Sequence, residues 1–130
     1  MCIRDSAEAL GKTLKAITNI FPLTIIDAGS NLTPLALKAL EYSTAIAAIA
    51  TQDILVLNQT RRLVSELITM MFPKEMILLV GNQIQKGHPV TMEIMGKTVG
   101  RPAFAAIPKD DQTCITCLLY TSDAATICSV

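Results

Sequence analysis

Short apolar runs that end in polar residues alternate along this chain with stretches of helical periodicity. The most continuous run is residues 75–80 (EMILLV), and Gly81, Asn82 and Gln83 follow it. Runs of this length are too short for helices and are typical of strands buried on both faces. Strands separated by helices indicate a parallel sheet with right-handed crossovers. The alternation therefore predicts an α/β fold in which residues 75–80 form a central strand.

Three further runs complete the expected sheet. Residues 23–27 (LTIID) end at Asp27 and lead into a small loop over residues 28–31. Residues 43–51 (STAIAAIAT) precede Gln52 and Asp53, and residues 102–107 form the last run. We therefore expect a three-layer, doubly wound architecture with about four parallel strands. At 130 residues the chain is small for such a domain, so we expect the fold to be incomplete.

Four stretches carry the apolar spacing of amphipathic helices: residues 7–21, 32–42, 54–71 and 90–99. Thr33 and Pro34 suit the N-cap and the first helical position of the second stretch. Within the first stretch, residues 6–13 (SAEALGKT) come close to the phosphate-binding pattern G-x-x-x-x-G-K-T. Ser6 replaces the first glycine and no strand precedes it, so we expect helix there and no phosphate cradle.

Composition excludes several classes of function. Lys plus Arg and Asp plus Glu number 11 each, so no excess of positive charge indicates nucleic acid or an anionic membrane as a partner. Aromatic residues make up 4% of the chain and Trp is absent, which argues against stacking of bases. No apolar run is long enough for a transmembrane segment, and residues 1–6 lack a signal-peptide pattern. The expected location is cytoplasmic.

The four cysteines, Cys2, Cys114, Cys117 and Cys128, all lie in the terminal segments. One C-x-x-C pair leaves a zinc site without half of its four ligands, so metal binding is not expected there. Residues 1–6 (MCIRDS) and 114–130 resemble translated sequencing-adapter read-through, so we expect neither segment to belong to the native fold. The native part is then residues 7–113, a piece of a longer protein.

Polar residues follow three of the predicted strands, at Asp27, at residues 51–53 and at Asn82. Parallel strands place their carboxyl ends at one edge of the sheet, where α/β proteins bind ligands. Each residue also has a purely structural interpretation, because Asp often caps a loop or turn. The single histidine, His88, is expected to be exposed in a loop, and no Ser-His-Asp set can be assembled.

In order and spacing, these blocks resemble the MinD/ParA-type P-loop ATPases, and most closely the pilus-assembly localisation ATPases of the CpaE/TadZ kind. The resemblance spans residues 23–27 with the loop and helix after them, 45–53, 77–83 and 104–110. It implies a P-loop NTPase-like fold. It also implies that Asp27 holds Mg²⁺ through water and helps to organise the attacking water, a role that suits a hard oxygen ligand.

The resemblance gives the remaining polar positions roles on the base side of a nucleotide. Asn82 would read the adenine edge, and Ile107, Pro108 and Asp110 would form the adenine-side loop. The family's phosphate loop should precede these blocks, and this sequence does not contain it. We therefore expect ATP and Mg²⁺ to serve the intact protein, and neither ATP binding nor hydrolysis to be strong in this chain alone.

Three functions remain open. The first is a fragment of a cytoplasmic ATPase that, when whole, forms a homodimer around ATP and positions Flp pilus or secretion machinery at the inner membrane or cell pole. The second is a non-enzymatic scaffold or protein-interaction module of the same fold. The third, a receiver-like domain, lacks the acidic cluster that its Mg²⁺ site would need near Asp27.

Overall fold

A computed structural model describes residues 3–111, which form two compact units, one ending at Ile46 and the other beginning at Ala47. The first unit holds α1 (Ile3–Ile20) and α2 (Pro34–Glu41), as the sequence predicts. Residues 3–6, expected to be a non-native leader, continue α1. Cys2, Cys114, Cys117, Cys128 and the predicted tail 114–130 lie outside the described residues.

Helices α1 and α2 pack against each other through a small residue. A Cβ atom on Gly11 would lie 3.1 Å from the Tyr42 hydroxyl and 3.3 Å from Lys38 Cε, so glycine allows the close approach. At the start of α2, Thr33 Oγ1 accepts a hydrogen bond from the Ala36 N–H at 3.1 Å, and Pro34 takes the first helical position. The predicted cap of this helix is confirmed.

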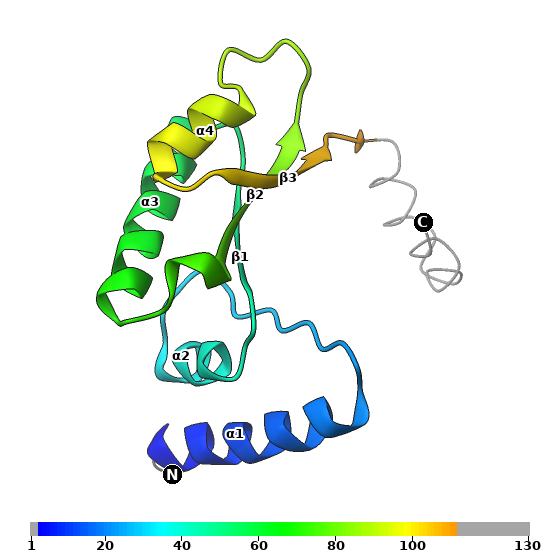
Figure 1. Ribbon diagram of the computed structural model, residues 1–130, viewed down its shortest axis with the longest axis vertical. Helices are drawn as coiled ribbons and strands as arrows, with labels where there is room; N and C mark the ends of the chain where they lie inside the picture. Colours follow the sequence, from blue (N-terminus) through cyan, green and yellow to red (C-terminus); the bar gives the residue numbers. More distant parts are fainter. Residues whose placement is uncertain (1–2, 112–130) are drawn as a thin grey trace. The chain divides into compact units, whose positions relative to one another are not determined.

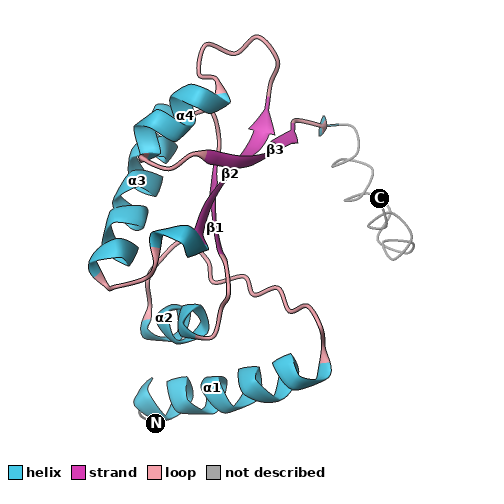
Figure 2. Ribbon diagram, viewed as in Figure 1, coloured by secondary structure: helices cyan, strands magenta, loops and turns pink. Residues whose placement is uncertain are grey.

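Residues 23–27 do not form the predicted strand. Figure 2 draws the segment between α1 and α2 as loop, and residues 23–29 have no regular secondary structure. Leu23 is 77% exposed and Ile25 is 87% exposed, so the expected burial is also wrong. A strand requires a hydrogen-bonded neighbour, and the described part of the chain places none beside this run.

The second unit contains β1 (Ile46–Ala50) except for its first residue, followed by α3 (Ile54–Thr69), η1 (Lys74–Met76), β2 (Ile77–Ile84), α4 (Met92–Val99) and β3 (Ala103–Pro108). The strands form a parallel three-stranded sheet in the order β1-β2-β3. The predicted α/β class and the central position of β2 are confirmed. The described residues contribute three strands to this sheet, where the sequence predicted about four.

Within this unit, α3 and α4 lie on the same side of the sheet (Figure 1) and pack against each other. The core between these helices and the sheet is aliphatic, as the low aromatic content predicts. Its largest fully buried side chains are Leu57, Leu67, Ile77, Leu79 and Met95. On the other side of the sheet, Ile49 of β1 remains 58% exposed and Phe104 of β3 remains 68% exposed.

This difference between the two sides gives a test of the core. Replacing Leu79, which is 0% exposed, with Ala should lower the free energy of unfolding by about 2–5 kcal/mol, because the change removes buried methyl groups and leaves a cavity. Ile49→Ala, on the open side, should cost less than about 0.5 kcal/mol. Urea unfolding followed by circular dichroism measures both, and equal losses would contradict this description of the core.

Candidate functional site

The carboxyl end of β2 contains an irregularity centred on Asn82 and Gln83. The pairing of β2 with β3 shifts register between Gly81 and Ile84, and Gln83 has a positive φ of 55°. Asn82 Oδ1 accepts a hydrogen bond from the Gln83 N–H at 2.9 Å. Bulges of this kind interrupt a ladder and redirect side chains, and they recur next to functional sites. The predicted strand end at Val80 is wrong, because β2 continues through this bulge to Ile84.

The end of β3 lies directly beside the bulge. Pro108 is opposite Ile84, and the Lys109 N–H donates to the Ile84 carbonyl at 3.1 Å. Ile107 is therefore next to the bulge in the ladder, and both Ile107 and Asp110 are exposed. The structure thus brings Asn82, Ile107 and Pro108 together at one sheet edge, with Asp110 two residues further along the chain.

Gln52 connects the end of β1 to the loop that follows β2. Its Nε2 donates to the Val90 carbonyl at 2.7 Å, and its Oε1 accepts from the Gln85 N–H at 2.7 Å. Within the loop, His88 Nδ1 accepts from the Val90 N–H at 3.1 Å. His88 is half-buried, so the prediction that it is exposed is wrong. The sequence marked Gln52 only as a residue after a strand, because its partners are distant in the chain.

Asp53 has a structural role at the same edge. Its Oδ1 accepts hydrogen bonds from the Leu55 N–H at 2.7 Å and the Val56 N–H at 3.2 Å, which caps the N-terminus of α3. The capping interaction satisfies backbone donors that the first turn of a helix leaves free. The carboxylate of Asp53 is thus engaged by the backbone of its own helix.

Asp27 lies in the first unit, in the loop between α1 and α2. The residue is exposed, and its Oδ1 accepts a hydrogen bond from the Gly29 N–H at 2.9 Å. Gly29 has a φ of 71°, a conformation that glycine adopts without strain. This is the local turn interaction that Asp commonly makes. Asp27 therefore lies at the end of the apolar run 23–27, on a backbone that no strand partner holds in the described residues.

The described residues do not fit the phosphate half of a nucleotide site. Gly11, Lys12 and Thr13 lie inside α1, and Thr13 Oγ1 donates to the Ala9 carbonyl at 3.0 Å. Their backbone N–H groups serve the helix and cannot wrap phosphate oxygens. Within residues 3–111, His, Cys, Asp and Glu side chains form no group of three or more that could hold a metal ion.

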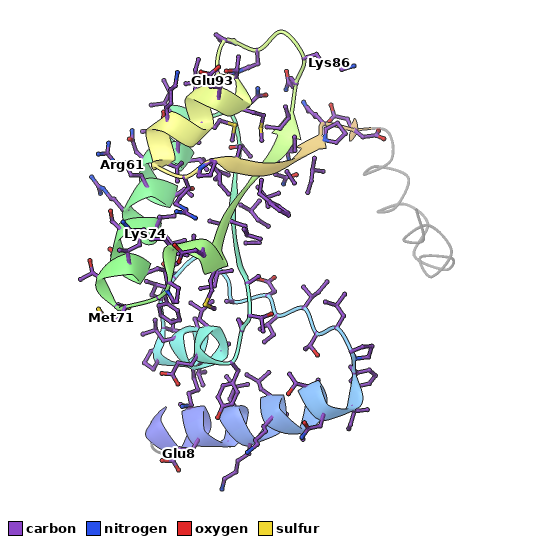
Figure 3. The ribbon with its side chains drawn as sticks, in the orientation of Figure 1. Glu8, Arg61, Met71, Lys74, Lys86 and Glu93 are labelled. Carbon is purple, nitrogen blue, oxygen red and sulfur yellow. The ribbon has the colours of Figure 1, made fainter. Side chains whose placement is uncertain are left out.

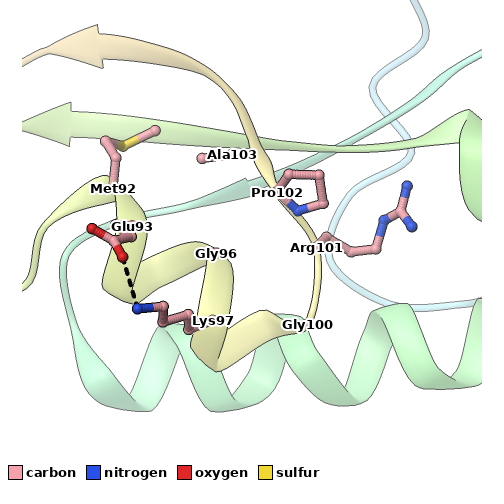
Figure 4. A pocket seen from close by; sticks show the side chains of 8 residues that line it. All are labelled: Met92, Glu93, Gly96, Lys97, Gly100, Arg101, Pro102 and Ala103. Carbon is pink, nitrogen blue, oxygen red and sulfur yellow. Dashed lines mark hydrogen bonds and ion pairs between the residues drawn. The ribbon is translucent and has the colours of Figure 1, made fainter.

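A surface groove of this unit lies away from these residues. An open groove of about 570 Å³ runs along α4 and the loop into β3 (Figure 4). In the groove, Lys97 pairs with Glu93 at 2.7 Å. Arg101 donates from Nε to the Ile77 carbonyl at 3.3 Å and from Nη2 to the Lys74 carbonyl, which fastens the start of β2. None of the predicted site residues lines this groove.

Charge pairs in the described residues are local and exposed. Lys38 contacts Glu41 at 2.8 Å, and this hydrogen bond, together with the attraction of the two charges, raises the pKa of Lys38. Near the candidate edge, Lys109 contacts Asp111 at 3.1 Å. Pairs of this kind contribute little to stability. In the described part of the chain, no helix has the length and apolar character needed to cross a membrane.

Comparisons with known proteins establish the fold. No protein-family model and no curated protein matches the chain. Among solved structures, the crystal structure of a ParA family ATPase from Chlorobium tepidum TLS superposes with a TM-score of 0.85 at 18% sequence identity. The match covers 94% of this chain and 51% of that chain, so this chain spans about half the length of that ATPase. The predicted P-loop NTPase-like fold is confirmed.

The structural role of Asp53 can be tested directly. Asp53→Ala should destabilise the chain by about 1 kcal/mol, because two N–H groups at the start of α3 lose their acceptor. Asp53→Asn retains an acceptor oxygen and should cost only a few tenths of a kcal/mol. Urea unfolding of the two variants measures the difference. Equal destabilisation by Ala and Asn would contradict the capping role.

Proposed function

We propose that the chain is part of a MinD/ParA-like ATPase and carries the base side of its nucleotide site. The observation that carries this proposal is the fold likeness to a ParA family ATPase over 94% of the chain. The bulge at Asn82 supports the base-side assignment, because it lies at a carboxyl sheet edge, where ligands of α/β proteins bind. In this proposal, ATP and Mg²⁺ are bound by the intact protein.

On the base side, Asn82 is the proposed adenine reader. A carboxamide offers both a donor and an acceptor, which matches the mixed edge of adenine. The position beside Ile107 and Pro108 gives the base an apolar wall, and Asp110 lies just beyond it. This half of the site is built from two hydrogen-bonded strands of one unit. Some affinity for adenosine should therefore remain in this chain.

On the phosphate side, Asp27 is the proposed Mg²⁺ residue, acting through water, and it helps to orient the attacking water. Residues 23–27 are apolar and have no regular secondary structure and no strand partner in the described chain. Thr24 Oγ1 is also buried without a hydrogen-bond partner among the described residues, an arrangement that usually costs about 1–3 kcal/mol. Both features suit a strand whose neighbour, together with the phosphate loop, belongs to a longer protein.

The more specific proposal, about the parent protein and its role in the cell, follows the sequence resemblance. The proposed parent is a CpaE/TadZ-like homodimer in the cytoplasm that positions Flp pilus or secretion machinery at the inner membrane or cell pole. Residues 7–113 are the proposed native part of this chain. The alternative is a scaffold of the same fold without ATPase activity, and the lack of a phosphate cradle in the described residues favours that alternative for this chain by itself.

Nucleotide titration tests which half of the site is present. Calorimetry with ATP and Mg²⁺ should detect no micromolar binding, because the phosphates lack a backbone cradle and a lysine. Adenosine should bind with a Kd of about 1 mM, equivalent to about 4 kcal/mol, and should shift the amide NMR signals of Asn82, Ile107, Lys109 and Asp110. Asn82→Ala should abolish these shifts, whereas Asn58→Ala, at an exposed position of α3, should not. Micromolar binding that depends on Mg²⁺ and Asp27 would contradict the proposed division.

Genomic sequence tests the proposed parent. The reading frame upstream of residue 7 should encode a strand followed by G-x-x-x-x-G-K-T, because phosphate binding requires that cradle. Sequencing the source DNA through this junction gives the answer. A natural start codon at residue 1, with no such pattern before it, would exclude the ATPase fragment and leave the scaffold.

A further inference from the structure

We propose that Gln52 is a positioning residue. Its carboxamide joins the two ends of the loop 85–90 by hydrogen bonds and thereby holds the adenine-side edge in place. This inference rests on the proposed function, since it concerns the same edge. The loop follows β2 and leads to α4, so its two ends lie close to Asn82 and to the start of that helix. Gln52 comes from a third segment, directly after β1.

The geometry of the carboxamide supports this role. A Gln side chain has one acceptor oxygen and a donor NH₂ group, and Gln52 uses both on the two ends of one loop. Both hydrogen bonds measure 2.7 Å, and the residue is half-buried. The partners Gln85 and Val90 are 33 and 38 residues away in sequence. A surface side chain without a positional role rarely satisfies both groups in this way.

The peptide between Ile84 and Gln85 is held from two sides. The Ile84 carbonyl accepts from the Lys109 N–H at the end of β3, and the Gln85 N–H donates to Gln52 after β1. Asn82 lies only two residues before Ile84, on a backbone whose ladder is already broken by the bulge. Beyond the bulge, these two hydrogen bonds fix the strand end, so Gln52 restrains the backbone that carries Asn82.

The loop itself has little else to hold it. Residues 85–87 are exposed, Gly87 has a φ of 79°, and Lys86 points away from the sheet (Figure 3). Inside the loop, His88 Nδ1 accepts a hydrogen bond from the Val90 N–H at 3.1 Å, and the His88 backbone nitrogen lies 3.5 Å from the Gln85 carbonyl, at the limit for a hydrogen bond. Compact surface loops of this length have ends that lie close together and are often functional. Neither of these two hydrogen bonds joins residue 85 directly to residue 90, whereas Gln52 binds both.

Three variants separate the contributions of the carboxamide. Gln52→Ala removes both hydrogen bonds, and Gln52→Glu keeps an acceptor for the Gln85 N–H but loses the donor to the Val90 carbonyl. Gln59→Ala is the matched control, because Gln59 is an exposed residue of the neighbouring α3. Urea midpoints are measured for all three, so that general loss of stability is distinguished from a change at the edge.

Amide hydrogen exchange of the full chain, measured without nucleotide, tests whether Gln52 holds the two ends of the loop together. In Gln52→Ala, the Gln85 amide should lose about tenfold in protection, whereas the Lys109 amide, which is bonded to Ile84, should change less than about twofold. In Gln52→Glu, the Gln85 amide should remain protected. Unchanged Gln85 protection in the Ala variant would show that the side chain does not hold the loop, and would overturn the inference.

Adenosine titration, followed by NMR of the Asn82 side-chain amide, tests the consequence for the site. Gln52→Ala should weaken adenosine binding by about three- to tenfold at an unchanged urea midpoint, Gln52→Glu less, and Gln59→Ala not at all. If Gln52→Ala lowers the protection of the Gln85 amide but leaves the adenosine affinity unchanged, the positioning role is overturned and the proposed function remains intact. No adenosine response in the unaltered chain would overturn the proposed function, and the positioning role with it.

Discussion

The second unit depends on the pairing of β2 with a strand on each side. Its position between β1 and β3 satisfies the backbone groups of both of its edges, and its side chains Ile77 and Leu79 enter the core under the helices. Arg101 fastens the carbonyls at its start, and Gln52 and Lys109 fasten its end. A strand held in this way is a rigid support, which is the condition for placing a binding side chain accurately.

The pairing of this strand with β3 is irregular at two points, between Leu79 and Val80 and again at the candidate site. Between Gly81 and Ile84 the register shifts, and Gln83 adopts a positive φ that is unfavourable for a residue with a Cβ atom. Such local strain persists only when the surroundings determine the conformation, and it is concentrated at functional positions. Here the surroundings are the hydrogen bonds of the Ile84–Gln85 peptide to β3 and to Gln52. These hydrogen bonds to neighbouring segments thus hold the irregular end of β2 in place.

Local patterns predicted most of the fold, whereas long-range pairing was predicted poorly. The helices followed from apolar spacing, and the cap at Thr33 followed from residue type. Residues 23–27 have the composition of a buried strand, but a strand also needs a neighbour, which composition does not reveal. Asn82 was proposed as a site residue from its place after a predicted strand, and it lies within β2, which continues to Ile84. The pair of hydrogen bonds by which Gln52 joins the two ends of the loop was not predicted, because its partners lie more than thirty residues away in sequence.

The two proposed halves of the site therefore differ in how firmly this chain builds them. Asn82 lies on a strand with neighbours on both sides, whereas Asp27 lies at the end of an unpaired segment and binds its own loop at Gly29. Mg²⁺ requires nearly ideal octahedral geometry, so a carboxylate that serves it needs a fixed backbone. Pairing residues 23–27 with a further strand would supply that constraint, as the hydrogen bonds of the Ile84–Gln85 peptide supply it near Asn82. In the proposed parent, the strand that carries the phosphate loop would therefore also fix Asp27, so that the phosphate cradle and the metal side form together.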